Sequence, residues 1–285
     1  MDRLLVATDF SARSDRALRR ASLIARKLGA SITLVHVVDA EQSERLVEAD
    51  RAATSDLLTE TVATLRQGDG IDADWMVKVD DVVGGILSSA GNLAADLIVI
   101  GPNRRRLRDI FIGTTAERLV QQSDFPLLVA VESPTADYRK TLLAIDFDEA
   151  SRSVGRKALA MGIFDHTDVV VMHAFDAPAQ GMMRRAMMHS EEIDDYIESE
   201  GSVAADRLEQ LRDELGLPRT EHSVVALTGG PARTILQSAQ SEACDLIVLG
   251  ATQRRGLERA LVGSVTADVI RDAHRDILIV PVSED

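Results

Sequence analysis

An internal repeat constrains the fold of this chain more than any other feature of its sequence. The segment LLVATDF near the start returns as TLLAIDF from position 141, and similarity continues beyond both. Asp9 then corresponds to Asp146, and His36 to His173, each pair 137 residues apart. Because self-similarity at a fixed spacing is typical of repeated structural units, the sequence predicts two diverged copies of one domain.

The spacing between the copies changes farther along the chain. Gly101 corresponds to Gly250 at a separation of 149 residues, and Gly113 to Gly263 at 150. The first change places an insertion of twelve residues in the second copy, between His173 and Gly250. The second change is a one-residue deletion in the first copy. We therefore expect a first domain over residues 1–134, a second over 138–285, and a linker within 132–139.

Short apolar runs alternate with amphipathic segments within each copy. RLLVAT, SITLVHVV, ADWMVK, DLIVIG and PLLVAV read as strands, and DRALRRASLIARKLG has apolar residues at helical spacing before a glycine suited to a C-cap. Strands that alternate with helices indicate a parallel sheet covered on both faces. The sequence predicts two tandem doubly wound α/β domains, each with five parallel strands in the order 3-2-1-4-5 and helices on both faces.

The exposed edge of the last strand in each copy, PLLVAV or DILIVPV, needs covering. Related subunits usually solve this by an isologous contact. We expect the two copies to pack as an intramolecular pseudo-dimer about a pseudo-twofold axis, with a homodimer of the whole chain left open.

Composition limits the class of protein. The chain has 285 residues, a formal net charge of −14 and one cysteine, Cys244. A strongly acidic chain repels nucleic acid and anionic lipid, and no apolar run approaches the roughly 20 residues that cross a bilayer. A single cysteine makes no internal disulfide, which agrees with a reducing compartment. We expect a cytoplasmic protein that binds neither nucleic acid nor membrane, with Cys244 in the core.

The segments that follow the fourth strand of each copy carry a family resemblance. The second copy keeps a glycine frame: Gly250 and two further residues precede position 253, and nine residues then separate that position from Gly263-Ser264. Gln253 replaces the middle glycine of the frame. In the first copy Gly101 and Gly113-Thr114 remain, Arg104 stands at the middle position, and the segment is one residue shorter. With Asp9 and Asp146 after the first strands, the chain resembles a tandem universal stress protein, and the resemblance covers nearly its whole length.

The resemblance implies an adenine-nucleotide site, with ATP or AMP and Mg²⁺ as ligands, mainly in the second domain. The residues it implies there are Ala144, Ile145, Asp146, Leu249, Gly250, Gly263, Ser264 and Val265. The weaker candidates in the first domain are Ala7, Thr8, Asp9, Gly101, Gly113 and Thr114. If both sites are degenerate, we expect the protein to bind no nucleotide.

Each candidate also has a structural interpretation. A loop that enters a helix offers unpaired N–H groups to a phosphate, but Gly-Ser and Gly-Thr are also ordinary N-caps. Asp9 and Asp146 could contact ribose or hold Mg²⁺ through water, or cap local backbone. Ser11 and Asp148 are expected N-caps, and His36 and His173 are expected packed strand residues. No protein-ligated metal site is indicated.

The insertion in the second copy contains four methionines, Met182, Met183, Met187 and Met188, ahead of a long charged helix. Methionines four apart give an adaptable apolar face. We expect this face to cover the top of the sheet or the contact between the copies. A binding surface for an apolar ligand or partner is the alternative.

Two functions of different class remain open from the sequence. One is a stress-response or signalling protein that binds an adenine nucleotide, mainly in the second domain. The other is a nucleotide-independent protein-interaction module whose partner is unknown. A main enzymatic role ranks below both, because the signature supplies binding groups but no set of nucleophile, base and orienting residue. Any ATP hydrolysis should be slow.

Overall fold

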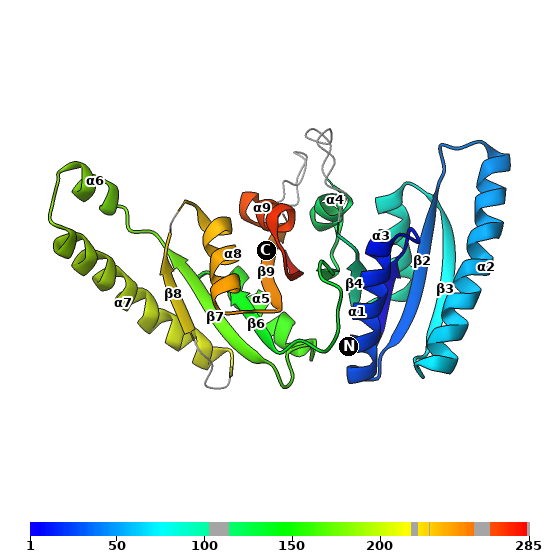
Figure 1. Ribbon diagram of the computed structural model, residues 1–285, viewed down its shortest axis with the longest axis horizontal. Coiled ribbons are helices and arrows are strands. Elements are labelled where there is room, and N and C mark those ends of the chain that lie inside the picture. Colours follow the sequence, from blue (N-terminus) through cyan, green and yellow to red (C-terminus); the bar gives the residue numbers. More distant parts are fainter. Residues whose placement is uncertain (103–113, 218–221, 228, 254–262, 284–285) are drawn as a thin grey trace.

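A computed structural model describes residues 1–102, 114–217, 222–227, 229–253 and 263–283. Within these residues the chain forms one ten-stranded sheet in the order β3-β2-β1-β4-β5-β10-β9-β6-β7-β8. The two halves lie side by side along the long axis of the molecule, with α4 and α9 near its middle (Figure 1). The structure therefore joins two domains through a single continuous sheet.

The first domain alternates strand and helix from end to end. Its elements are β1 (Arg3–Ala7), α1 (Ala12–Leu28), β2 (Ser31–Asp39), α2 (Glu44–Gly68), β3 (Ala73–Asp80), α3 (Val82–Leu93), β4 (Leu97–Ile100), α4 (Thr115–Gln122) and β5 (Leu127–Val129). Ser11 caps α1 through its side chain, as expected, and Gly29 ends the helix in the left-handed conformation that glycine adopts without strain.

The second domain repeats this order with one additional helix. Its elements are β6 (Lys140–Ala144), α5 (Glu149–Ala160), β7 (Asp168–Phe175), α6 (Gln180–Arg185), α7 (Ser190–Glu214), β8 (His222–Ala226), α8 (Pro231–Ser241), β9 (Leu246–Gln253), α9 (Ser264–Asp272) and β10 (Asp276–Ser283). Asp148 caps α5 by accepting a hydrogen bond from the Ser151 N–H, which confirms the second expected cap.

The strand order confirms the predicted topology in both domains. Each half reads 3-2-1-4-5 from its outer edge, and all pairs inside a half are parallel. The halves join where β5 pairs with β10 in antiparallel register, with Leu128 opposite Leu278. Each last strand covers the edge of the other, as the expected pseudo-dimer requires.

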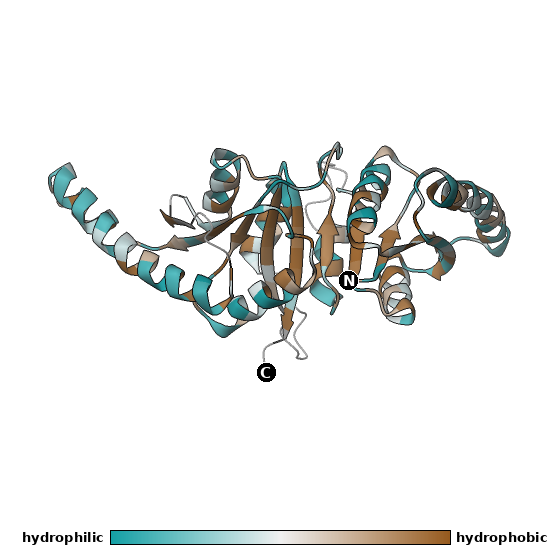
Figure 2. Cartoon of the chain, turned by 90° about the horizontal axis from the view of Figure 1, so that it is seen from below, coloured by the Kyte–Doolittle hydropathy of each residue, from teal (hydrophilic) through white to brown (hydrophobic). Residues whose placement is uncertain are grey.

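Helices cover both faces of the sheet. One face packs against α1, α2, α5 and α7, and the other against α3, α4, α8 and α9. Neighbouring strand residues alternate between the faces: Leu4 and Val6 lie in one cluster and Leu5 in the other. Figure 2 shows this arrangement as apolar strands at the centre and hydrophilic helix surfaces outside. The near-continuous apolar runs follow from burial on both faces.

A buried polar cluster fastens the seam between the domains. Asp276, the fully buried first residue of β10, accepts hydrogen bonds from the backbone N–H groups of Val131 and Glu132 at 2.8 and 3.0 Å. Its other oxygen accepts from Arg20 Nε and from the Tyr138 hydroxyl, both at 2.8 Å. The cluster therefore ties α1 and the linker to the second domain. Burial and the Asp276 charge raise the pKa of Tyr138 well above its usual value.

The methionine-rich insertion does not cover the sheet or the seam, so that expectation was wrong. It forms α6 and its flanks, at the end of the molecule remote from α4 and α9 (Figure 1). Met182, Met187 and Met188 are 63%, 91% and 39% exposed. The insertion lengthens the connection between β7 and α7 beyond the outer strands, where no sheet surface remains to be covered.

Within the described ranges, no helix is long and apolar enough to cross a membrane.

Candidate functional site

A cavity of about 280 Å³ opens at the carboxyl ends of β1 and β4 in the first domain. Ligands of doubly wound sheets bind at this point, where the winding direction reverses. Four of the six weaker candidates from the sequence line it: Ala7, Thr8, Asp9 and Gly101. Its other walls come from β2, α3 and the start of α4, including His36, Val37, Ile86 and Ala116.

The Asp9 carboxylate is engaged by the start of α1. It accepts hydrogen bonds from the Ser11 N–H at 3.1 Å and from the Ser11 hydroxyl, and it pairs with Arg13 at 3.3 Å. Burial raises the pKa of Asp9, but the hydrogen bonds from Ser11 and Ser14 and the Arg13 charge outweigh burial, so the pKa is lowered. Asp9 is thus an ionised local cap that still lines the cavity and leaves its carboxylate 59% exposed.

Asp146 is arranged differently. Its Oδ1 accepts a hydrogen bond from the Phe147 N–H at 2.8 Å and lies 3.7 Å from Nδ1 of His173, and the carboxylate is 72% exposed. Its own N–H donates to the Ser151 hydroxyl. Fewer local partners therefore occupy Asp146 than Asp9.

The two repeated histidines are packed strand residues, as expected. His36 Nδ1 lies 2.9 Å from the Thr8 carbonyl, and His173 Nδ1 lies 3.1 Å from the Ile145 carbonyl. Each ring therefore bridges the first and second strands of its domain. Among the described residues no group of three or more His, Cys, Asp or Glu side chains could hold a metal ion.

Gly101 and Gly250 are small for a packing reason that the sequence did not reveal. A Cβ at Gly101 would collide with the Arg13 backbone carbonyl, and one at Gly250 would lie 2.6 Å from Cγ2 of Val154. Both glycines therefore allow the first helix of their domain to approach the fourth strand. The Gly250 carbonyl also accepts a hydrogen bond from the Thr266 hydroxyl, which ties β9 to α9.

The start of α4 is closed by a capping box. The Thr114 hydroxyl accepts from the Glu117 N–H at 3.1 Å, and Glu117 Oε2 accepts from the Thr114 N–H at 2.8 Å. The Glu117 side chain is 13% exposed and lies 3.8 Å from Arg271 of α9. A carboxylate therefore occupies the helix start where a phosphate would bind. Sequence analysis missed Glu117, although the spacing Thr114-x-x-Glu117 is a recognisable capping-box signal.

The start of α9 has no such carboxylate. Its N-cap is Gly263, which has no side chain that could accept a hydrogen bond from the first turn. Buried Ala116 and Leu119 of α4 correspond to buried Thr266 and Val269 of α9, so the counterpart of Glu117 is Ala267. A Cβ at Gly263 would meet no atom of the described residues within 4 Å. The two helices thus occupy equivalent places in their domains, but only the first turn of α4 contains a carboxylate.

The other second-domain candidates occupy the expected edge. Ala144 ends β6, and the Ile145 that follows is buried. Leu249 is buried in β9, while Ser264 and Val265 open α9. Ala144 and Leu249 thus lie at the carboxyl ends of two adjacent strands, β6 and β9, whereas Ser264 and Val265 line a separate groove beside α8.

Strand β9 is longer than expected. The fourth strand of the first domain ends at Ile100, whereas β9 pairs with β10 as far as Gln253 opposite Ser283. Residues 250–253, expected to begin a phosphate-binding loop, therefore continue the ladder. Gly113 and two groups of loop arginines, which could neutralise phosphate but are more simply read as solvated loop charge, lie outside the described residues: Arg104, Arg105, Arg106 and Arg108 in the first copy, and Arg254, Arg255 and Arg259 in the second.

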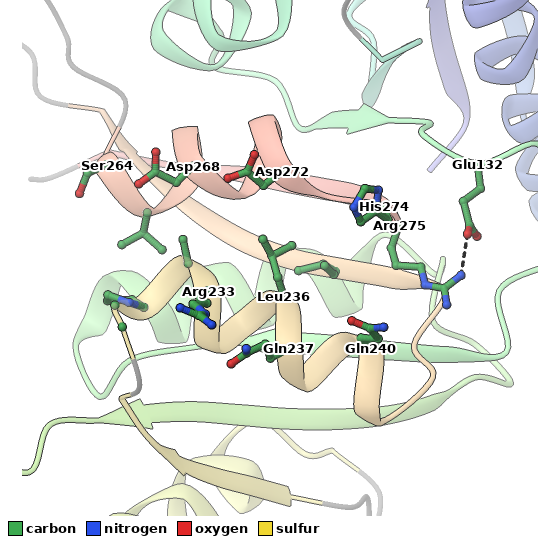
Figure 3. Close-up of a pocket in the computed structure, with 16 residues that line it drawn as sticks. Glu132, Arg233, Leu236, Gln237, Gln240, Ser264, Asp268, Asp272, His274 and Arg275 are labelled. Carbon is green, nitrogen blue, oxygen red and sulfur yellow. Dashed lines mark hydrogen bonds and ion pairs between the residues drawn. The ribbon is translucent and has the colours of Figure 1, made fainter. Parts of the chain in front are cut away.

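A groove of about 810 Å³ lies between α8 and α9 (Figure 3). Ser264, Asp268 and Asp272 follow one another along α9, and Arg233, Gln237 and Gln240 lie along α8. An ion pair between Glu132 and Arg275 lies at the end remote from Ser264. In the first domain Asp81 and Arg118 pair across the corresponding helices at 3.3 Å, whereas their counterparts are Gly230 and Asp268. The second domain lacks this pair.

Comparisons with known proteins agree on one family. Residues 1–130 and 137–281 each match the model of the universal stress protein family. A universal stress protein of Methanocaldococcus jannaschii is 30% identical over 145 residues, 50% of this chain and 82% of the relative. One from Mycolicibacterium smegmatis is 23% identical and covers 97% of this chain and 96% of the relative. The crystal structure of a universal stress protein from Archaeoglobus fulgidus has a TM-score of 0.70 at 17% identity and covers 97% of both chains.

Proposed function

Since the chain belongs to the universal stress protein family, with two such domains in tandem, we propose that it is a stress-response protein that binds an adenine nucleotide in its second domain. The observation that carries this proposal is the difference between the two helix starts. Glu117 supplies an internal carboxylate at the start of α4, whereas Ala267 leaves the first turn of α9 without one.

The phosphates would lie at the start of α9. The first N–H groups of a helix lack partners within the helix, and the helix dipole favours an anion beside them. Gly263 has φ −50° and ψ 136°, a conformation open to any residue, and no part of the chain that the structure describes lies within 4 Å of the position of its missing Cβ. The fold therefore does not require glycine at this position, and the absence of a side chain leaves room for a ligand outside the helix. The Ser264 side chain could add a hydroxyl donor.

The nucleoside end would lie along β6 and β9. Asp146 is the acceptor proposed for ribose hydroxyls or for a water ligand of Mg²⁺, because its exposed carboxylate has few local partners. Ala144, Ile145, Leu249 and Gly250 would form the adjoining wall, and Val265 would follow the phosphates. ATP and AMP both fit this scheme.

An interaction module independent of nucleotide is the second candidate. The exposed methionines of the α6 segment favour it, because large apolar side chains grouped at one surface commonly mark a site of contact. The partner would be a protein, and neither domain would need a ligand.

Titration calorimetry with ATP and AMP tests the nucleotide proposal. Gly263→Val should abolish binding in the second domain, since the new side chain projects into the space assigned to phosphate without meeting any of the described residues. Gly113→Val is the matched change in the first copy and should leave that binding unchanged. Equal ATP affinity in the wild type and Gly263→Val, with circular dichroism unchanged, would refute the assignment. Release of no nucleotide from the purified, denatured protein, together with no binding by calorimetry, would favour the interaction module.

A further inference from the structure

We infer that the two domains accept different ligands, and that Glu117 makes the cavity of the first domain selective for an uncharged nucleoside over a nucleotide. This inference rests on the proposed adenine-nucleotide function, since it assigns the ligand of the corresponding site in the other copy. Glu117 acts here as a specificity-determining residue.

The size of the first-domain cavity agrees with a nucleoside. Its volume of about 280 Å³ lies just below the range of about 300–1,000 Å³ usual for drug-sized ligands. The cavity has a mixed lining, with apolar walls from Val37, Ile86 and Ile100 and polar groups from Thr8 and Asp9. A flat base suits the apolar walls, and sugar hydroxyls suit the exposed Asp9 carboxylate as donors.

The charges around this cavity disfavour a phosphate. Arg13, the one arginine or lysine among its described lining residues, already pairs with Asp9. Glu117 directly follows the lining residue Ala116 and places its carboxylate against the first turn of α4. Asp81 precedes the lining residue Val82 and caps α3 by accepting from the Val83 N–H at 3.1 Å.

The capping box also occupies two of the N–H donors that a phosphate would use. The Thr114 N–H donates to the Glu117 carboxylate, and the Glu117 N–H donates to the Thr114 hydroxyl. A phosphate at this helix start would have to displace a carboxylate that is 13% exposed. Arg271 of α9 lies 3.8 Å from the same carboxylate, and the attraction between the two charges favours this position of the Glu117 side chain. An uncharged ligand needs none of these N–H donors and does not have to displace the Glu117 carboxylate.

Calorimetry of the full-length chain with adenosine and AMP tests this selectivity. A Gly263→Val background closes the second domain, so that the signal comes from the first. We expect adenosine to bind in this background and AMP to bind at least tenfold more weakly. Adding Glu117→Gln should bring the AMP affinity to within about threefold of that for adenosine, because glutamine preserves the capping box and removes the charge.

Two further variants control for the position of the ligand. Val82→Trp should abolish adenosine binding in the Gly263→Val background, because Val82 lines the cavity and is 43% exposed, so a larger side chain can enter without disturbing the core. Ala267→Glu, placed alone in the wild-type chain, supplies the missing carboxylate to α9 and should weaken ATP binding in the second domain at least tenfold.

The outcomes separate this inference from the proposed function. AMP binding as tight as adenosine in the Gly263→Val background, an AMP-to-adenosine ratio unchanged by Glu117→Gln, or absence of adenosine binding would each overturn the selectivity of the first domain. Failure of the wild type to bind ATP, while the Gly263→Val chain still binds adenosine, would instead overturn only the nucleotide function of the second domain.

Discussion

Replacement of Asp276 by asparagine should weaken the seam between the domains more than any comparable change at the sheet ends. Asparagine preserves the oxygen that accepts from the Val131 and Glu132 N–H groups. It replaces the oxygen that faces Arg20 and Tyr138 with an NH2 group. The Arg20 guanidinium therefore loses its charged partner in a site where the Arg20 side chain is 6% exposed.

The expected loss follows from the burial of this pair. Removing one partner of a buried ion pair costs about 3–5 kcal/mol, because the remaining charge stays desolvated and unpaired. Arg20 keeps two other contacts, a hydrogen bond to the Ala136 carbonyl and the Tyr138 ring 4.0 Å away. We therefore expect the lower end of that range, about 3 kcal/mol in the free energy of unfolding. At about 2–4 °C per kcal/mol, the melting temperature should fall by roughly 6–12 °C.

Urea and thermal unfolding followed by circular dichroism measure this loss, and Asp245→Asn provides the matched control. Asp245 accepts from the Arg139 N–H at 2.8 Å, but its arginine partner is 84% exposed at 3.6 Å. Exposed pairs contribute about 0–1 kcal/mol. A loss below about 1 kcal/mol in Asp276→Asn, equal to that of the control, would refute the view that this ion pair holds the seam.

A double-mutant cycle separates the pair from its surroundings. Arg20→Met combined with Asp276→Asn should cost less than the sum of the single changes by at least about 1 kcal/mol, because the second change removes the charge stranded by the first. Additive costs would show that the two side chains act independently.

Three further predictions concern single residues. Tyr138 has a pKa raised in the folded protein, so above about pH 10 the unfolded chain loses a proton that the native state keeps; stability should fall as pH rises, and less steeply in Tyr138→Phe, as urea midpoints between pH 9 and 11 would show. Burial raises the pKa of the Cys244 thiol to about 11, so a thiol reagent at pH 8 should label it only after denaturation; rapid labelling of native protein would contradict its burial. Gly250→Ala should cost about 1–3 kcal/mol by overpacking against Val154, whereas Gly263→Ala should cost about 1 kcal/mol or less, so equal thermal shifts would contradict the packing described.

The sequence was sufficient to predict the topology because hydrophobic pattern and repetition both report on it. Runs such as DLIVI have apolar residues at every position, which requires burial on both faces, and two copies of the pattern implied two equal sheets. A contact between the halves was expected from the need to cover two related edges, and the structure shows it to be an antiparallel pairing of β5 with β10. These are properties that local sequence carries.

The details of the candidate site depend on contacts that local sequence does not carry. The role of Gly101 comes from the Arg13 carbonyl, which is distant in sequence and close only because α1 crosses the fourth strand. The extension of β9 to Gln253 depends on pairing with β10. The exposure of Met187 depends on where the sheet ends, which a helical pattern of methionines does not reveal. Glu117 is the exception, because its spacing from Thr114 indicates a capping box in the sequence itself. Its importance comes from the comparison with Ala267, the corresponding residue, which has no carboxylate.

Covalent linkage of the two domains frees them from the symmetry of a true dimer. In a homodimer every substitution appears twice, so a residue that closes one site necessarily closes its twin. In this chain the β5–β10 seam preserves the dimer-like contact while α4 and α9 are encoded separately. A carboxylate at position 117 can therefore coexist with an alanine at position 267. Each half can therefore acquire substitutions at its own helix start that the other half does not share.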